Sequence, residues 1–375
     1  MSESKASDTS FGSAVGRWKG LGPYYAMFPV DFAFDIVAKY SRPGGAVLDP
    51  FAGRASSVFA ACAQNRIGYG IEINAVGWIY GRVKLHPASE KRVLQRVEQL
   101  DMLARQIDDS VLRALPPFFA ACYTPYVLRF LLSARAHLQW QTSVVDRTVA
   151  AFLLVYLHGK APYALSSQMR QGKAMAPDYS VRWWEEHGYT PPDINPVDFL
   201  NKRIKWRYAK GKPNVRQGNV WLADSTKIVG RLQTIVDKRR RRFNLLFTSP
   251  PYCGLTNYYY DQWLRLWLLG GPAQPEPAAG EHRGKFYDRE RYKNMLLRVF
   301  KGCAEVMSRN ATIYVRTDAR EFTYEATVAA LKEAFPKKDL TVFQQPLSKQ
   351  TQTSLYGDKE TKPGEVDLLL RSGHQ

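Results

Sequence analysis

The spacing of apolar residues predicts an α/β unit near the start of the chain. Apolar residues at helical spacing predict a helix over residues 28–40, and a short apolar run then predicts a buried strand over 46–48. A turn containing Gly53, an Ala-rich helix over 57–64 and a strand over 68–71 follow. Strand, turn, helix and strand in this order open a doubly wound, mainly parallel sheet.

This alternation stops after residue 84 and returns after residue 216. In between, the pattern predicts helices over 89–114, 125–140, 144–158 and 196–210, with an irregular stretch at 159–195. Later elements are predicted as strands over 219–222, 244–248, 311–316, 341–344 and 366–370, and as helices beginning near 261 and spanning 292–307 and 325–334. We therefore expect a catalytic domain formed by residues 14–84 and 217–375, a helical insertion at 85–216, and a flexible tail at 1–13.

The charge of the chain indicates a polyanionic partner. Its 53 Lys and Arg residues exceed its 34 Asp and Glu residues, which gives a formal net charge of +19. An excess of this size favours binding to nucleic acid. The longest apolar run, residues 149–157, is too short to span a bilayer, and the polar residues 1–13 do not resemble a secretory leader. The four scattered cysteines show no metal-binding spacing, so we expect a cytoplasmic protein with no metal site and no membrane partner.

Polar groups follow three of the predicted strands. Gly53 lies in the turn after the first strand, Glu72 ends the second, and Asp224 follows the strand over 219–222. In an open α/β sheet, ligands bind beyond the carboxyl ends of the strands. An acidic residue about 20 residues after a glycine turn commonly accepts hydrogen bonds from ribose hydroxyls. Taken singly, each feature also fits an ordinary turn or a solvated carboxylate, and Asp224 would meet an amino group or a water.

The most specific segment is Ser249-Pro250-Pro251-Tyr252, directly after a predicted apolar strand. Two consecutive prolines fix the backbone and remove two N–H donors, so carbonyl oxygens remain as acceptors. Ser249 adds a hydroxyl, and Tyr252 adds an aromatic face on which a flat base can stack. The segment suits a substrate that donates protons, such as an exocyclic amine. The alternative is a rigid turn that only ends a strand.

The chain resembles the amino-group DNA methyltransferases of bacterial restriction–modification and related systems. Residues 49–53 (DPFAG) look like the cofactor motif of this family, and 249–252 look like its catalytic motif. Further similar segments are 22–25 with 28–29, 166–169, 177–180 and 364–368. The resemblance implies a Rossmann-like class I methyltransferase sheet with helices on both faces, interrupted by the helical insertion. It also implies S-adenosyl-L-methionine as cofactor, double-stranded DNA as partner, and the option of a cognate restriction endonuclease.

The resemblance assigns roles to individual residues. The implied cofactor-binding residues are Phe28, Pro29, Asp49, Pro50, Phe51, Gly53, Ser56, Glu72, Asp224 and Thr248. The implied catalytic residues are Ser249, Pro250, Pro251 and Tyr252, which hold a flipped base while its amine attacks the cofactor methyl group directly. The family usually has Gly-Thr where this chain has Ala55-Ser56. Because alanine adopts positive φ poorly, we expect weaker or slightly shifted cofactor binding at this turn, but not its loss.

The insertion is the expected DNA-reading part, because its basic residues alternate with aromatic ones. The expected DNA-binding residues are Arg170, Lys173, Arg182, Trp183, Trp184, Lys202, Arg203, Lys205 and Arg207. For any single aromatic residue among them, packing in the core is the alternative. The basic run at 238–242 is expected either to contact the DNA backbone or to end a helix in solvent.

Ser249 favours cytosine N4 as the methylated atom, because serine at this position is commoner among the cytosine enzymes of the family. Adenine N6 is the first alternative, since both bases present an amine beside a ring nitrogen. An RNA amino-methyltransferase and a non-catalytic DNA-binding protein are the further alternatives. The recognition sequence cannot be predicted, because it depends on how side chains are placed against base edges.

Overall fold

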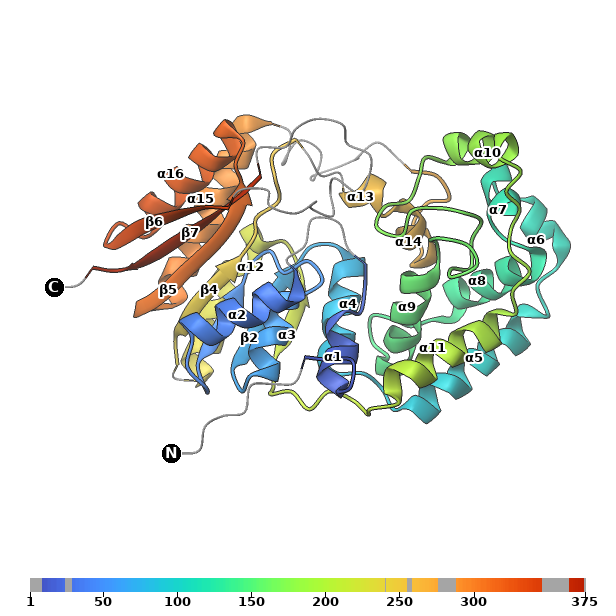
Figure 1. Cartoon of the computed structure of the whole chain (residues 1–375), viewed down its shortest axis with the longest axis horizontal. Coiled ribbons are helices and arrows are strands. Elements are labelled where there is room, and N and C mark those ends of the chain that lie inside the picture. The colour runs from blue at the N-terminus through green and yellow to red at the C-terminus, as the bar shows by residue number, and fades with distance from the viewer. Residues whose placement is uncertain are drawn as a thin grey trace.

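The computed structural model describes residues 9–23, 29–239, 241–254, 258–275, 288–345 and 364–373. Within these residues a seven-stranded sheet has the order β3-β2-β1-β4-β5-β7-β6 (Figure 1). The strands are β1 (Ala46–Asp49), β2 (Ile67–Glu72), β3 (Asn219–Leu222), β4 (Phe243–Thr248), β5 (Met307–Asp318), β6 (Lys338–Gln345) and β7 (Glu365–Ser372). Strands β1 to β5 pair in parallel, whereas β7 is antiparallel to both β5 and β6.

Helices cover both faces of the sheet (Figure 1). On one face lie α2 (Val30–Tyr40), α3 (Ser56–Ala63) and α4 (Ala75–Leu85), and on the other lie α12 (Ser225–Arg239), α15 (Arg289–Val306) and α16 (Glu321–Ala334). Side chains alternate between the faces of a strand, so Val47 joins the core under α2 to α4 and Leu48 joins the core under α15. The predicted fold class, a Rossmann-like class I methyltransferase sheet, is confirmed.

The chain between α4 and β3 is helical. Its helices are α5 (Glu90–Ala104), α6 (Asp109–Arg113), α7 (Pro117–Cys122), α8 (Pro125–His137), α9 (Val144–Tyr156), α10 (Pro177–Glu186) and α11 (Pro196–Tyr208). α9 is buried along nearly its whole length and packs against α4 and α5. The guanidinium of Arg147 lies 4.6 Å from the ring centroid of Trp78, which adds a cation–π contact between α9 and α4. One apolar cluster therefore continues from the sheet through α4 into the insertion.

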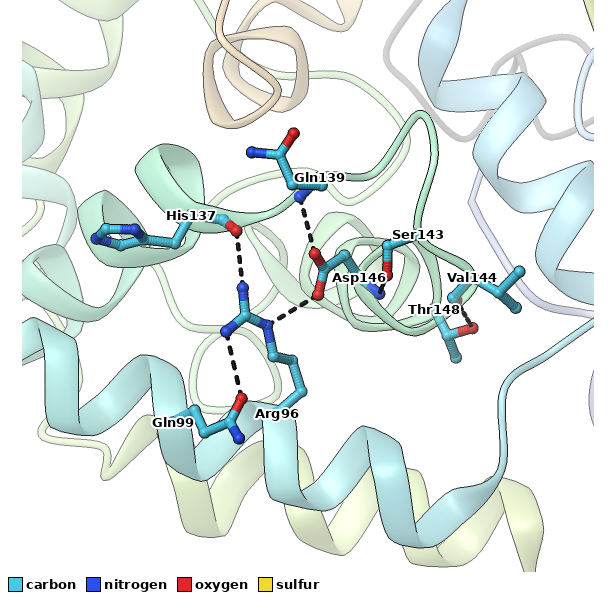
Figure 2. A network of polar contacts seen from close by, with 8 residues as sticks. All are labelled: Arg96, Gln99, His137, Gln139, Ser143, Val144, Asp146 and Thr148. Carbon is cyan, nitrogen blue, oxygen red and sulfur yellow. Dashed lines mark hydrogen bonds and ion pairs between the residues drawn. The ribbon is translucent and has the colours of Figure 1, made fainter.

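A partly buried ion pair joins three helices of the insertion, as Figure 2 shows. Arg96 of α5 donates from Nε to Asp146 of α9 at 2.8 Å and from Nη2 to the carbonyl oxygen of His137 at 2.7 Å. The second carboxylate oxygen of Asp146 accepts from the backbone N–H of Gln139 at 2.9 Å. Ser143 begins α9 by accepting from the backbone N–H of Asp146 at 3.1 Å. This network fixes how α5, α8 and α9 lie against one another.

Several predicted elements need correction. The helix expected over 89–114 is interrupted, because Asp108 caps a new helix, α6, by accepting from the N–H of Ser110 at 2.8 Å. The stretch expected to be irregular contains α10, and α4, α7 and α12 were not predicted. α4 lies between the sheet and the insertion and is buried on most sides, so it lacks the amphipathic period that marks a surface helix.

The remaining described helices are α1 (Ala14–Lys19), α13 (Tyr258–Asp261) and α14 (Trp263–Leu268). α1 packs on α3 and α11, and α14 packs on α4 and α8. None of the described helices is long and apolar enough to cross a membrane. Across the described ranges, no three His, Cys, Asp or Glu side chains gather in a way that would hold a metal ion.

Candidate active site

Asp49 ends β1 and ties the predicted cofactor turn to β4. Its Oδ1 accepts from the Thr248 hydroxyl at 2.6 Å and from the backbone N–H of Phe51 at 3.1 Å. Ser57 donates to the other carboxylate oxygen. Burial raises the pKa of Asp49 to about 6, although these hydrogen bonds oppose the shift. The carboxylate is enclosed by its own chain, so Asp49 acts by positioning the turn.

The turn after β1 is organised by Glu72. Gly53 has φ 52°, and its N–H donates to Glu72 Oε2 at 2.7 Å. The backbone N–H of Asn74 donates to Oε1 at 2.8 Å. Glu72 therefore links the Gly53 turn to the start of α4 through both of its carboxylate oxygens. On the other side, Ser225 donates to the carbonyl oxygen of buried Pro50.

Ala55 adopts the left-handed backbone conformation, at the position where the resembling family usually has glycine. Its φ is 59°, and its methyl group is fully buried at the start of α3. The methyl faces Gly81 of α4, where an added Cβ would lie only 2.9 Å from that of Ala55. Next to it, Ser56 accepts from Arg54 Nε at 3.2 Å, and Arg54 Nη1 donates to the carbonyl oxygen of Gly22 at 2.9 Å. These contacts fasten the turn to the N-terminal segment.

Asp224 follows β3 and caps α12. Its Oδ1 accepts from the backbone N–H and the hydroxyl of Thr226, at 2.9 and 2.7 Å. The N–H of Ala223 donates to the carbonyl oxygen of Glu72 at 2.9 Å, so Asp224 and Glu72 end neighbouring strands. Burial, followed by the charges of Glu72 and Asp224, raises the pKa of Tyr259. Tyr259 of α13 therefore lies close to both carboxylates.

The predicted catalytic motif leaves β4 at the same edge of the sheet. Pro250 and Pro251 are buried, whereas Ser249 and Tyr252 are half-buried. The Tyr252 hydroxyl donates to Glu365 Oε1 of β7 at 3.0 Å. Burial, and then the charge of Glu365, raises the pKa of Tyr252 well above its usual value. The phenol is therefore neutral at physiological pH.

A buried polar network behind Tyr252 was missed as part of the site. Arg316 of β5 lies 3.4 Å from Glu365 and forms a bidentate pair with Asp367 at 2.7 and 2.8 Å. Its guanidinium also lies 3.7 Å from the ring centroid of Phe32 on α2. The resemblance of residues 364–368 to the family was the available signal. The resemblance identified this segment but did not indicate that Glu365 accepts a hydrogen bond from the Tyr252 hydroxyl.

The backbone after Tyr252 is held by Arg320. Arg320 Nη2 donates to the carbonyl oxygen of Cys253 at 3.0 Å, and its Nε pairs with Asp318. A cavity of about 490 Å³ opens here, bordered by Cys253, Arg289, Arg320 and the first turn of α16. Burial raises the pKa of the Cys253 thiol, which keeps it protonated. Cys253 and Gly254, which directly follow the predicted catalytic motif, line this cavity, whereas Ser249 to Tyr252 do not.

The segment that follows the catalytic motif is fastened to the insertion. Lys173 pairs with Asp261 of α13 at 2.7 Å, and the N–H of Ala174 donates to the carbonyl oxygen of Asp261 at 3.0 Å. Arg265 of α14 is fully buried and donates to the carbonyl oxygens of Leu154 and Gln171, at 2.7 and 2.5 Å. Lys173, expected to bind DNA, thus has a partner within the protein.

Two of the expected DNA-binding residues lie inside the protein, and for these the expectation is corrected. Trp184 is 1% exposed and donates from its indole nitrogen to the carbonyl oxygen of Gln168 at 2.6 Å. Arg207 is 7% exposed and donates to the carbonyl oxygen of Arg17 in α1. Both side chains therefore pack in the interior of the protein instead of contacting DNA. Trp183, by contrast, is half-buried and stacks between His187 and Tyr189, with centroids 4.5 and 5.1 Å away.

The other expected DNA-binding residues do not form one surface. Arg170 and Arg182 are exposed in and before α10, whereas Lys202 and Lys205 are exposed on α11. Arg203, also on α11, is half-buried, and its guanidinium lies 3.2 Å from the ring centroid of Phe199. α10 and α11 lie on opposite sides of the insertion, with α10 on the side of α13 (Figure 1).

Arg241 and Arg242, from the basic run at 238–242, contact the amino-terminal edge of the sheet. Arg241 donates to the carbonyl oxygen of Gly44 before β1 at 2.6 Å, and Arg242 donates to that of Glu305 before β5. Both lie at the end of the strands opposite the catalytic motif. Phe28, expected to bind the cofactor, and Arg240 lie outside the described residues. Pro29 is exposed and precedes the first turn of α2.

Comparison with known families supports the first part of the site. Residues 2–76 match the N6/N4 methyltransferase family, described as DNA methylase. This match agrees with the predicted family over these residues. The matched segment contains the turn after β1 and Glu72, whereas the predicted Ser249–Tyr252 motif lies beyond it.

Comparison with curated proteins gives no match. Among solved structures, the chain is similar to the rRNA methyltransferase aviRa from Streptomyces viridochromogenes, in two structures at 1.5 and 2.4 Å. Both share 11% sequence identity with the chain and cover 96% of each chain, with TM-scores of 0.35 and 0.36.

Proposed function

We propose that the protein is a DNA methyltransferase that transfers a methyl group from S-adenosyl-L-methionine to an exocyclic amine, preferably cytosine N4. The observation that carries the proposal is the hydrogen bond between Thr248 and Asp49, at 2.6 Å. It joins the residue before the Ser249 motif to the turn that matches the methylase family. A segment that can accept hydrogen bonds from an amine therefore lies beside a turn that can hold the methyl donor.

The residues at the ends of β1, β2 and β3 fit the cofactor. The Gly53 turn brings backbone close to a ligand, and Glu72 and Asp224 supply carboxylates at the ends of adjacent strands. Carboxylates accept hydrogen bonds from ribose hydroxyls and from an amino group. Bound S-adenosyl-L-methionine supplies a methyl group on a sulfonium centre, which is electrophilic.

The residues after β4 orient the amine. The Ser249 hydroxyl and the Pro250 carbonyl oxygen accept its two hydrogens, which leaves the nitrogen lone pair directed away from them. Tyr252 presents a neutral ring for stacking, because its hydroxyl is held by Glu365. Gly53, Glu72 and Asp224 would hold the methyl donor on the side of this lone pair, and the bound cofactor would supply the methyl group while the amine loses one proton to solvent. Positioning and oriented dipoles supply most of the rate enhancement.

The test is to express the protein in a host that lacks these modifications and to quantify the nucleosides of its DNA by mass spectrometry. N4-methylcytosine above an empty-vector control is the expected result. Detection of N6-methyladenine instead would support a DNA methyltransferase but would contradict cytosine as its target base. Modified nucleosides in RNA alone would overturn DNA as the substrate.

Two variants separate catalysis from folding in this test. Tyr252→Ala removes the stacking ring and is expected to lower methylation at least 100-fold, as removal of a positioning group at a reacting centre commonly does. Tyr324→Ala, a half-buried tyrosine on α16, is the matched control and is expected to keep activity. Full turnover by a folded Tyr252→Ala protein would contradict the proposed role of the motif.

A further inference from the structure

The surface formed by α11 and the segment after it carries one sign of charge. Residues 199–217 contain seven basic residues and no acidic one, namely Lys202, Arg203, Lys205, Arg207, Lys210, Lys212 and Arg216. Lys202, Lys205, Lys210, Lys212 and Arg216 are exposed. Unpaired cations at this density repel one another unless a polyanion neutralises them.

Two exposed aromatic rings lie within this basic surface. Trp206 is 43% exposed and Phe11 is 64% exposed, with ring centroids 5.9 Å apart. The guanidinium groups of Arg17 and Arg207 lie 4.7 and 5.3 Å from the Trp206 ring centroid. Large exposed rings flanked by cations are the combination that proteins use to hold nucleic acid without reading its sequence.

This surface lies at the edge of the sheet opposite the catalytic motif. The N–H of Arg216 donates to the carbonyl oxygen of Cys62 at 3.0 Å, near the C-terminal end of α3. Asn219 then begins β3 opposite Tyr69, near the start of β2. Glu72 is at the other end of β2, and a six-residue strand spans about 20 Å. Figure 1 shows α1 and α11 on the side of the molecule away from α13.

We propose that the surface of Arg17, Lys202, Lys205, Trp206, Lys210, Lys212 and Arg216, here called the α1–α11 surface, binds the phosphate backbone of duplex DNA without sequence preference. Its distance from Glu72 means that it does not contact the base pairs next to a target base held at Tyr252. It binds a separate stretch of duplex and so keeps the enzyme on DNA between methylation events. The choice of DNA as the polyanion rests on the proposed function.

A charge-reversal variant tests the proposal through binding alone. Lys205→Glu/Lys210→Glu/Lys212→Glu changes three exposed residues, and affinity for a fluorescent 30-base-pair duplex is measured by anisotropy at several salt concentrations. Each lost phosphate contact lowers the slope of log K against log salt by about 0.9. We therefore expect a slope smaller by about 2 to 3 and an affinity at least 10-fold lower. Turnover of a short duplex at saturating concentration is expected to remain unchanged.

The matched control carries the same charge change on another surface. Arg298→Glu/Lys332→Glu/Lys337→Glu changes exposed residues in and after α15 and α16. Equal loss of DNA affinity and salt dependence in both variants would overturn the proposal, because net charge alone would then explain binding. Binding by the first variant that matches the unmodified protein would also overturn it.

The measurement also separates two other outcomes. A loss of binding to anionic phosphatidylserine vesicles without a loss of binding to DNA would assign the surface to membranes and overturn the proposal. A protein that methylates no nucleoside but shows the expected change in salt slope would refute the proposed function and leave the α1–α11 surface supported.

Discussion

Asp49 in the sheet and Asp146 in the insertion are both buried carboxylates, but their partners differ. Asp146 accepts from the guanidinium of Arg96, at 2.8 Å, and from one backbone N–H (Figure 2). Asp49 is bound by two hydroxyls and one backbone N–H, and none of its described hydrogen bonds comes from a cation. The insertion carboxylate has a compensating charge, whereas the carboxylate beside the cofactor turn does not.

This difference separates two uses of a buried charge. A carboxylate paired with a cation, such as Asp146 with Arg96, links helices through a compensating charge. Neutral hydrogen-bond donors offset only part of the cost of burying a charged carboxylate. For Asp49 the remaining cost appears as a pKa raised to about 6. Glu365 is intermediate, because it has both Arg316 at 3.4 Å and the neutral Tyr252 hydroxyl at 3.0 Å.

The largest effect is expected from breaking the pair in the insertion. Arg96→Met leaves Asp146 buried without its cation and should lower the free energy of unfolding by about 4 kcal/mol. Urea denaturation followed by circular dichroism measures the change. Arg92→Met, one turn earlier on α5 and exposed, is the control and should change stability by less than about 0.5 kcal/mol. A similar small change for Arg96→Met would show that the ion pair is dispensable.

A pH-dependent effect is expected at Asp49. Its folded pKa of about 6 lies above its unfolded value, so the native state binds more protons between pH 4 and 6. The stability of the unmodified protein relative to Asp49→Asn should therefore fall by about 3 kcal/mol as pH rises through this window, and stay constant above it.

Denaturation curves of both proteins between pH 3.5 and 8 measure this difference. Asp35→Asn, at an exposed position on α2, is the matched control and should show no such window. A relative stability that rises with pH would mean that Asp49 is stabilised as a charge, and would contradict the prediction.

A smaller effect is expected at α4, the helix that both regions share. A Cβ on Gly81 would lie 2.9 Å from Ala55 Cβ and 3.2 Å from Val220 Cγ2, so Gly81→Ala should cost about 2 kcal/mol of stability. Adding Ala55→Gly removes one clash and a residue with positive φ, and should recover about 1 kcal/mol.

Thermal denaturation of the two single variants and the double variant gives the coupling between these positions. Gly20→Ala, where an added Cβ meets nothing within 4 Å, is the control. Additive effects of Ala55→Gly and Gly81→Ala would show that the two sites do not touch in solution.

The smallest effect is expected from Tyr252→Phe. The ring remains, but the hydroxyl that Glu365 holds is lost, so turnover should fall about 10-fold, or about 1.4 kcal/mol, with an unchanged KM for the cofactor. Steady-state methylation with radiolabelled cofactor measures both constants, with Tyr324→Phe as the control. If Tyr252→Phe is as inactive as Tyr252→Ala, the hydroxyl itself takes part in the reaction.

The sheet could be predicted because its strands are short apolar runs, each followed by a polar residue. Elements with a buried surface on every side were harder to predict. α4 lacks an amphipathic period because it packs on the sheet and the insertion at once. The helix over 89–114 was predicted as continuous because the pattern does not show that Asp108 caps a new helix.

The residues of the candidate site follow from motifs, whereas their supports depend on tertiary contacts. Glu365 lies 113 positions from Tyr252 in the chain, and β7 brings them to 3.0 Å. Trp184 and Arg207 were predicted as DNA contacts because composition does not show which side of a helix is buried. Composition also could not predict that α11 lies at the edge of the sheet opposite Tyr252.

The place of β7 between β5 and β6 has a consequence for biosynthesis. β7 follows every other described element of the site in the chain, yet it supplies both the interior strand of this part of the sheet and the Glu365 carboxylate. A ribosome that stops before residue 365 releases a chain with the cofactor turn and the Ser249 motif but without the anchor for Tyr252. If the Ser249 motif is catalytic as proposed, prematurely terminated chains are expected to be inactive, and the contact that holds Tyr252 forms only late in translation.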